Sequence, residues 1–131
     1  MEGRVEILED KELYSQLHYQ VFGTNNGKVP EVVYVAKTKD GVIGGFVAGH
    51  WEMTGIFYIE YAGALPEFRR KGWLRYIKML LDPRISYLTV TEHTHTLIMK
   101  TLLSVGFIPV GSRYHDDTFY IEWARQGVKN G

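Results

Sequence analysis

The chain has 131 residues, with 15 basic and 15 acidic side chains and 45% hydrophobic residues. Length and composition predict one domain over residues 1–131 with a sizeable core, and the absence of cysteine excludes disulfides, thiolate metal ligands and a cysteine nucleophile. No apolar run reaches the roughly 18 residues that span a bilayer and no secretory signal is visible, so we expect a cytoplasmic protein without a membrane partner.

A short strand and an amphipathic helix are predicted at the N-terminus. The strand covers residues 5–9. Asp10 can cap the following helix with its carboxylate, and Gly23 can end it in the left-handed conformation. Apolar residues recur every four positions between these two signals, at Leu13, Leu17 and Val21.

Two tight turns then join three strands. Residues 31–38 are rich in β-branched side chains, and Asp40-Gly41 is a strong hairpin signal before a second strand at 42–51. A turn at 53–55 leads to a third strand at 58–65. The middle strand contains several glycines, which indicate a bulge or close backbone packing, namely Gly44, Gly45 and Gly49.

The second half alternates helices and strands. Asp82-Pro83 ends a helix at 73–81, because proline cannot continue the helical hydrogen bonds. Gly106 ends a later helix whose apolar face would contain Ile98, Leu102 and Val105. The expected elements are a helix at 73–81, a strand at 85–90, a helix at 94–105, and strands at 107–110 and 118–123 joined by a polar loop at 111–117.

This order, β-α-β-β-β-α-β-α-β-β, predicts an α+β fold. We expect a single mixed, mostly antiparallel sheet of about seven strands with helices on both faces. The helix between the strands at 58–65 and 85–90 is a crossover, so those two strands should run parallel.

A basic turn precedes the helix at 73–81. Five basic residues and one acidic residue lie between Glu67 and Lys78, so the local balance is 5 − 1 = +4 on a neutral chain. A glycine before a helix lets the backbone approach an anion, and the first helical N–H groups then point at it. A focused positive patch favours a small polyphosphate ligand and makes a nucleic-acid partner unlikely, because nucleic acid usually needs a broader basic face.

Residues 64–72, Ala-Leu-Pro-Glu-Phe-Arg-Arg-Lys-Gly, resemble the pyrophosphate-binding segment of the GNAT superfamily of acyl-CoA-dependent N-acetyltransferases. The resemblance covers nearly the whole chain and is that of a divergent member, of a kind that occurs in bacteria and phages. Leu74 stands where the family usually has a small residue. The matching residues are Arg69, Arg70, Lys71, Gly72 and Trp73.

A second block, residues 102–107, resembles the late helix and turn of the family. Gly106 and Phe107 match, but Leu102 occupies the position of a tyrosine that often protonates the departing CoA thiolate, and His95 stands where an Asn is common. Leucine cannot donate a proton. Two functions therefore stay open: an active enzyme with another proton donor, or a catalytically silent binding, structural or virion-associated module.

The resemblance implies transfer of an acetyl group from acetyl-CoA to a primary amine on a small molecule, a peptide or a lysine. The family splays the two parallel strands, so that the pantetheine arm pairs with the first of them and a backbone N–H near Leu65 polarises the thioester carbonyl. The residues implied in binding acetyl-CoA are Ala64, Leu65, Arg69, Arg70, Lys71, Gly72, Trp73 and Leu74. Trp73 can also simply cover the sheet, which is the favoured interpretation.

Glu60 is the first candidate for the general base that accepts the amine proton; the alternative is a surface glutamate paired with a neighbouring cation. Tyr58 shares its strand face by alternation, and is one of several tyrosines that could replace the missing acid, with Tyr61, Tyr87 and Tyr114.

His93 and His95 follow the strand at 85–90, and an imidazole with an ordinary pKa of about 6.5 can act as a base or shuttle. We take His93 as the catalytic candidate and His95 as a cap of the following helix. A His-x-His pair also suggests a metal, but no spacing supplies a third ligand, so no metal site is predicted. Exposed aromatic strands near the C-terminus would allow a homodimer.

Overall fold

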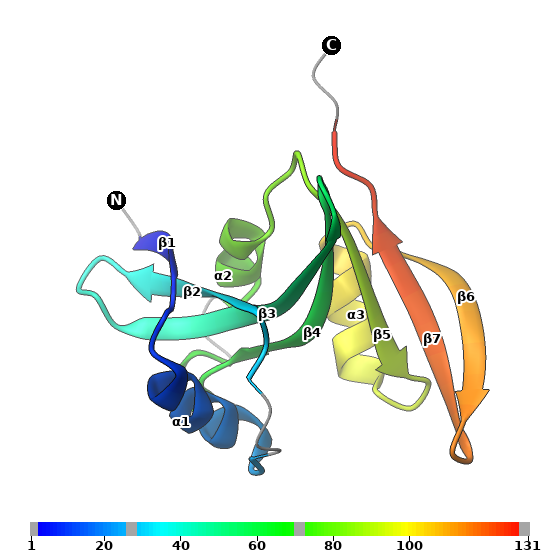
Figure 1. The fold of residues 1–131 in the computed structure, drawn as a ribbon, viewed down its shortest axis with the longest axis horizontal. Coiled ribbons are helices and arrows are strands. Elements are labelled where there is room, and N and C mark those ends of the chain that lie inside the picture. The colour runs from blue at the N-terminus through cyan, green and yellow to red at the C-terminus, as the bar shows by residue number, and fades with distance from the viewer. Residues whose placement is uncertain (1–2, 26–28, 70–72, 129–131) are drawn as a thin grey trace. The chain divides into compact units, whose positions relative to one another are not determined.

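Strands and helices follow one another in the predicted order in the computed structural model, which describes residues 3–25, 29–69 and 73–128 (Figure 1). A short 3₁₀ helix, η1, is the one addition to that order. The elements are β1 (Gly3–Ile7), α1 (Lys11–Phe22), β2 (Val32–Thr38), β3 (Ile43–Met53), β4 (Ile56–Ala64), η1 (Pro66–Phe68), α2 (Trp73–Leu80), β5 (Ser86–Glu92), α3 (Thr96–Ser104), β6 (Ile108–His115) and β7 (Thr118–Arg125).

The strands form one mixed sheet in the order β1-β2-β3-β4-β5-β7-β6, which confirms the predicted α+β class. β4 and β5 run parallel, as the helical crossover between them requires, whereas β1–β2, β2–β3, β5–β7 and β6–β7 are antiparallel. The chain divides into two compact units, which we describe separately: unit 1 contains Met1–His50 and Glu60–Leu81, and unit 2 contains Trp51–Ile59 and Asp82–Gly131. That residues 1–131 form a single domain stays a prediction.

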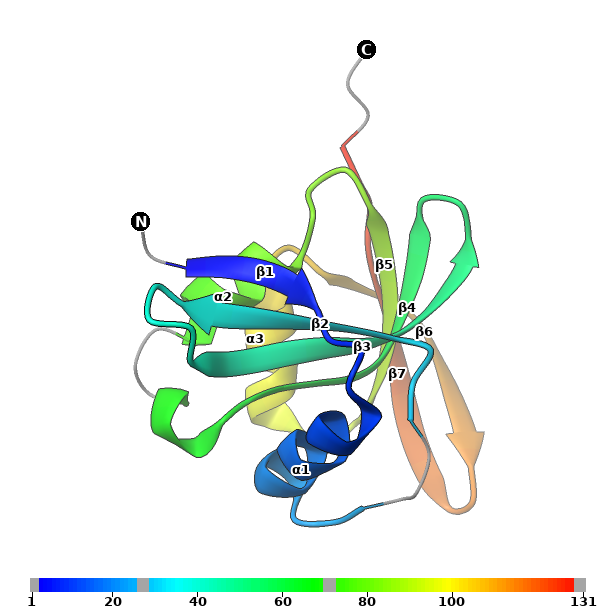
Figure 2. The same cartoon turned by 60° about the vertical axis from the view of Figure 1, so that its left-hand side comes forward.

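In unit 1, α1 and α2 lie on opposite faces of the strands (Figures 1 and 2). The Asp10 carboxylate accepts the N–H of Leu13 at 3.0 Å, and Gly23 has a φ of 73°, so both predicted helix ends are confirmed. The apolar face of α1 packs on β2 and β3, and the buried cluster consists of Tyr14, Leu17, Val33, Val35, Phe46 and Ala48.

The β2–β3 pair contains the irregularity that its glycines predicted. Ala36 pairs with Gly45, but Lys37 pairs with Ile43, so Gly44 is an extra residue on β3. Such a bulge bends the strand and interrupts the ladder locally. The predicted hairpin at Asp40-Gly41 is also confirmed, and Gly41 adopts a φ of 84° that favours glycine.

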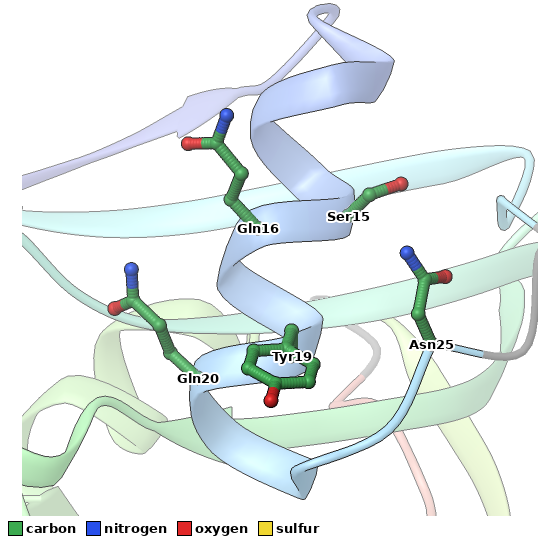
Figure 3. A pocket seen from close by; sticks show the side chains of 5 residues that line it. All are labelled: Ser15, Gln16, Tyr19, Gln20 and Asn25. Atoms are coloured by element: carbon green, nitrogen blue, oxygen red, sulfur yellow. The ribbon is translucent and has the colours of Figure 1, made fainter.

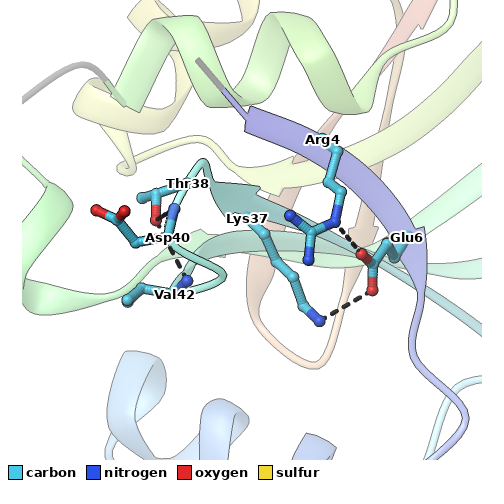
Figure 4. Close-up of polar contacts among 6 residues, drawn as sticks. All are labelled: Arg4, Glu6, Lys37, Thr38, Asp40 and Val42. Atoms are coloured by element: carbon cyan, nitrogen blue, oxygen red, sulfur yellow. Dashed lines mark hydrogen bonds and ion pairs between the residues drawn. The ribbon is translucent and has the colours of Figure 1, made fainter. Parts of the chain in front are cut away.

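Polar contacts join β1 to β2 and lie within the turn between β2 and β3 (Figure 4). Glu6 on β1 pairs with Lys37 on β2 at 2.9 Å and with Arg4 on its own strand. The hydrogen bond from Lys37, followed by that from Arg4, lowers the pKa of Glu6. Across the turn, the Thr38 hydroxyl accepts the N–H groups of Asp40 and Val42 at 3.3 and 3.2 Å.

In unit 2, aromatic side chains fill the interior between β4, β5 and β7. Phe57, Tyr87, Phe107 and Trp123 are all buried. The indole N–H of Trp123 donates to the Thr91 hydroxyl at 2.9 Å, which satisfies its one polar atom inside the core.

Unit 2 differs from the sequence-based prediction at residues 111–117. Residues 111–117 were expected to form a loop, but β6 continues to His115 and β7 begins at Thr118. Only Asp116 and Asp117 make the turn, with φ values of 49° and 62° that fit a two-residue hairpin. Every residue of β6 is exposed, so this edge strand shows no alternation of apolar and polar side chains that could reveal it.

Smaller differences concern element boundaries. The first strand lies at Gly3–Ile7, two residues earlier than expected, and α3 begins at Thr96. Val105 is buried as predicted for the apolar face of this helix, but Ile98 is 46% exposed, so it does not belong to a buried face.

Candidate functional site

The regular pattern of β4 changes in its middle. Its pairing with β5 covers three residue pairs, from Ile56–Ser86 to Tyr58–Leu88. At Ile59 the Thr89 hydroxyl donates to the backbone carbonyl at 3.0 Å. Phe57 and Ile59 are buried in alternation, whereas residues 60–63 are all half-buried. The second half of β4 therefore has four consecutive half-buried residues rather than one alternating face.

Glu60 begins this stretch and has a partner that the sequence analysis did not identify. Its Oε2 lies 3.0 Å from Nδ1 of His50 on the neighbouring strand β3, within unit 1. The His50 side chain is 37% exposed and that of Glu60 is 21% exposed. The predicted alternative for Glu60, a carboxylate paired with Lys or Arg, is replaced by a carboxylate–imidazole pair.

The backbone of Leu65 is already hydrogen-bonded within unit 1. Its N–H donates to the Gly44 carbonyl at 3.0 Å, and its carbonyl accepts the N–H of Phe68 at 2.8 Å in η1. The N–H of Leu65 itself is therefore engaged with the β3 bulge, and the expectation that a backbone N–H near Leu65 polarises a thioester carbonyl stays a prediction.

Arg69 links the end of β4 to the end of α1. Its Nε donates to the Ala64 carbonyl at 3.3 Å and its terminal nitrogen to the Val21 carbonyl at 2.9 Å. Carbonyls in the last turn of a helix have no helical partner and carry partial negative charge, so they attract a guanidinium. The Arg69 guanidinium thus joins the end of β4 to the last turn of α1.

Trp73 covers the sheet, as favoured from the sequence. A Cβ built on Gly45 would lie 2.5 Å from the Trp73 ring, so the indole rests directly on the bare backbone of β3. Leu74, the next residue of α2, is 42% exposed. The predicted anion-binding residues Arg70, Lys71 and Gly72 lie outside the described residues.

The other two catalytic candidates lie in unit 2. Tyr58 is half-buried and sits on β4 at its last residue pair with β5. His93 is exposed; its backbone N–H donates to the Phe119 carbonyl at 3.0 Å, and its ring packs edge-on against the Phe119 ring. His95 occupies the N-cap position of α3, but its side chain makes no capping bond and instead contacts Glu92 at 3.1 Å. The predicted position of His95 as the cap of α3 is confirmed, but the cap is made by its backbone carbonyl, which accepts the N–H of Met99 at 3.0 Å.

Two of the tyrosines considered as acids make structural hydrogen bonds. The Tyr87 hydroxyl accepts the N–H of Asp82 at 2.9 Å, and the Tyr114 hydroxyl donates to Asp117 at 3.0 Å. Leu102 is half-buried on α3, and its carbonyl accepts the N–H of Phe107 at 2.9 Å. Its hydrocarbon side chain supplies no proton.

A buried polar pair lies beneath the site in unit 1. The Tyr14 hydroxyl is 2.9 Å from Nδ1 of His18, and both residues are almost fully buried. Burial, followed by the charges of Tyr61 and Glu60, raises the pKa of Tyr14, so its hydroxyl keeps its proton. Burial also lowers the pKa of His18, which favours the neutral imidazole.

A polar hollow lies beside α1 (Figure 3). Amide and hydroxyl side chains surround it, and none of the predicted catalytic or CoA-binding residues is among its lining residues, which are Ser15, Gln16, Tyr19, Gln20 and Asn25.

Within the described ranges, no group of three or more His, Cys, Asp or Glu residues could hold a metal ion. No helix in those ranges is long and apolar enough to cross a membrane.

Comparison by sequence finds neither a matching family model nor a matching curated protein. Comparison by structure finds strong matches. The chain is similar to ribosomal-protein-S18-alanine N-acetyltransferase from Escherichia coli, with a TM-score of 0.76, 13% identity, and coverage of 98% of this chain and 96% of that chain.

Two further structures are similar over nearly their whole length. Naa50 from Arabidopsis thaliana, in complex with the bisubstrate analogue CoA-Ac-MVNAL, has a TM-score of 0.72 and 14% identity, with 96% and 99% coverage. An acetyltransferase from Bacillus subtilis in complex with CoA has a TM-score of 0.67 and 13% identity, also with 96% and 99% coverage. The sheet order, the parallel β4–β5 pair and these matches agree: the chain has the fold of the GNAT acetyltransferases.

Proposed function

We propose that this protein is an N-acetyltransferase that moves an acetyl group from acetyl-CoA to a primary amine on a small molecule, a peptide or a lysine. One observation carries the proposal: over 96–98% of its length the chain shares its fold with acetyltransferases, two of them solved with CoA or a CoA-containing analogue. Because folds host many functions, the residues of the site must support the chemistry independently.

The charge and size of the side chains in unit 1 suit a CoA ligand. Cationic side chains lie on and just before α2, at Arg69, Arg75 and Lys78. The sequence has two more, Arg70 and Lys71, directly after Arg69. Such a cluster attracts a diphosphate, which carries its charge on a few oxygens. The run Ala62-Gly63-Ala64 has small side chains, so an extended pantetheine arm can approach the backbone of β4.

Acetyl transfer requires a neutral amine, because the amine nitrogen attacks the thioester carbon with its lone pair. The carbon–nitrogen bond then forms, the carbon–sulfur bond breaks, and the thiolate leaves with the electron pair. Glu60, half-buried where the alternation of β4 ends, is the carboxylate that we propose assists proton removal. The donor that protonates the thiolate is water, since Leu102 cannot act.

Leu102 favours a second function, that of a catalytically silent module. With leucine at the usual position of the acid, the chain would also suit a silent binding or structural module that keeps the CoA site without turnover. The two functions agree on ligand binding and differ only in acetyl transfer.

Two assays separate these functions. Acetyl-CoA at 100 times its Kd should stabilise the protein by about 2.7 kcal/mol in thermal unfolding. Thiol release should then be measured with spermidine, with peptides bearing a free N-terminal alanine or methionine, and with Nα-blocked lysine. Stabilisation with thiol release supports the transferase, and stabilisation without release supports the silent module. If acetyl-CoA gives no stabilisation, the transferase and a silent CoA-binding module are both wrong, and a structural role without CoA is left.

A further inference from the structure

We propose that His50 is the general base of the transfer reaction and that Glu60 is the residue that orients it, an inference that rests on the proposed function. The observation behind it is the 3.0 Å contact between Nδ1 of His50 and Oε2 of Glu60 on adjacent strands of unit 1. It changes the role of Glu60 from direct proton acceptor to positioning residue.

We assign the protonation pattern of the imidazole from this contact. An ionised carboxylate can only accept hydrogen bonds, so Nδ1 of His50 must carry the hydrogen that the contact requires. In the neutral ring, Nε2 then holds the lone pair, and this is the atom that can take a proton. When it does, the adjacent carboxylate stabilises the imidazolium, as carboxylates do for histidine bases in other enzymes.

Exposure and base strength both favour the imidazole as the proton acceptor. The His50 side chain is 37% exposed against 21% for Glu60, so the histidine is the more accessible member of the pair to an incoming amine. Imidazoles titrate about two units closer to neutral pH than carboxylates, and general bases work best when they titrate near the working pH.

The location of the pair links it to the site. Glu60 starts the half-buried stretch of β4, residues 60–63, which is followed by the buried Ala64, and along this stretch we place the pantetheine arm. A pair that served only to join β3 to β4 would need no charged group, because the backbone hydrogen bonds of a sheet already join its strands.

Other titratable groups surround the pair in unit 1, and each could affect its pH dependence. On β4, Tyr61 follows Glu60, and on α1 the buried Tyr14 and His18 face this end of the sheet, with Tyr14 responding to the charge of Glu60. On the β2 side, Glu31 precedes Val32, which pairs with Gly49 next to His50.

Two protons leave the ammonium form of the amine during the reaction, and each has a defined acceptor. Nε2 of His50 removes one proton from the ammonium form of the amine, directly or through a water, and passes it to solvent. The neutral amine attacks the thioester carbon, and the carbon–sulfur bond breaks. The second proton leaves the new amide nitrogen and ends on the CoA sulfur through water. The products are the acetylated amine, CoA and one released proton.

The decisive experiment compares kcat/KM against pH for the wild type, His50→Gln and Glu60→Gln, using the most active amine of the panel above. His50→Gln should lower kcat/KM by roughly 10²–10⁴ and remove the rise with pH that reports the imidazole. Glu60→Gln should keep that rise but move it to lower pH, because the imidazolium loses its carboxylate. His115→Gln is the matched control, since His115 also pairs with a carboxylate, Asp116, at 3.1 Å but on an exposed turn, and should match the wild type.

Nitrogen-15 NMR of the histidine side chains gives a readout that does not depend on turnover. His50 should carry its hydrogen on Nδ1 in the neutral wild type, and less so in Glu60→Gln. The proposal is overturned if His50→Gln keeps the wild-type rate and profile, if Glu60→Gln alone removes the rise, if neutral His50 carries its hydrogen on Nε2, or if no amine accepts the acetyl group. Binding of acetyl-CoA by all three proteins would show that such a failure concerns His50 and not the CoA site.

Discussion

At the scale of single residues, Trp73 and Gly45 fit so closely that the strand has no room for a side chain at position 45. A Cβ there would lie 2.5 Å from the indole and 2.9 Å from the Gly63 carbonyl. We predict that Gly45→Ala destabilises the protein by about 1–3 kcal/mol, the usual cost of forcing extra atoms into a packed site. Urea unfolding measures this change.

The neighbouring glycine provides the control. A Cβ on Gly44 would meet its nearest atoms at 3.5 Å, an ordinary contact, and Gly44 does not have a positive φ. Gly44→Ala should therefore unfold at nearly the wild-type urea concentration. Equal stability of the two variants would show that the indole does not rest on Gly45.

The buried His18 makes stability depend on pH. Its pKa is lowered in the folded chain, so between its ordinary value of about 6.5 and the lower native value the unfolded chain binds more protons. The contribution of His18 to the free energy of unfolding is therefore fully present above about pH 6.5 and falls as the pH drops through this window. Below the native pKa, His18 causes no further change in stability.

His18→Gln should flatten this part of the curve, because glutamine does not titrate and its amide can either donate a hydrogen bond to the Tyr14 hydroxyl or accept one from it. Thermal unfolding between about pH 7.5 and pH 5 measures the effect. His115→Gln, at a side chain that is 74% exposed, should leave the slope unchanged. A slope that survives in His18→Gln would assign the pH dependence to other groups.

At the scale of elements, the start of α1 depends on one carboxylate. Asp10 accepts the N–H of Leu13, one of the helical donors that otherwise has no partner. Asp10→Ala should cost about 1 kcal/mol and lower the thermal midpoint by several degrees. Glu9→Ala removes an exposed carboxylate one position earlier and should have little effect. Similar losses in both variants would mean that charge, rather than capping, explains the change.

Caps, turn residues and a crossover in the sequence correctly predicted the elements that carry such local signals. Asp10 and Gly23 define α1, Asp40-Gly41 defines the first hairpin, and the helical crossover fixes the parallel β4–β5 pair. β6 was missed because an exposed edge strand has no buried face, so its polar residues 111–115 follow a loop-like pattern.

The candidate site was only partly predictable. Glu60 was identified, but its partner His50 depends on how β3 and β4 align, which no local motif records. The short turn at Thr54-Gly55 does not supply the signal, because a regular hairpin with this two-residue turn places His50 opposite Ile59, one position before Glu60. The engagement of the Leu65 N–H could not be predicted either, because its acceptor is the Gly44 carbonyl at a bulge.

At the scale of the whole molecule, a neutral chain concentrates positive charge in one short segment. The net charge is zero, yet residues 67–78 carry five basic groups and one acidic group. Long-range attraction by the whole protein is therefore weak, and any preference for a diphosphate must come from this segment. Our account requires that segment to bind CoA.

Calorimetric titration of CoA into the wild type, Lys71→Glu and the control Lys39→Glu tests this requirement most directly. Lys39 is an exposed residue of the β2–β3 turn, so its reversal makes the same change of charge outside the basic segment. We predict measurable heat with the wild type, binding about ten-fold weaker with Lys71→Glu, which is about 1.4 kcal/mol, and unchanged binding with Lys39→Glu. Absence of heat with the wild type, or equal affinity of the two variants, would contradict the account.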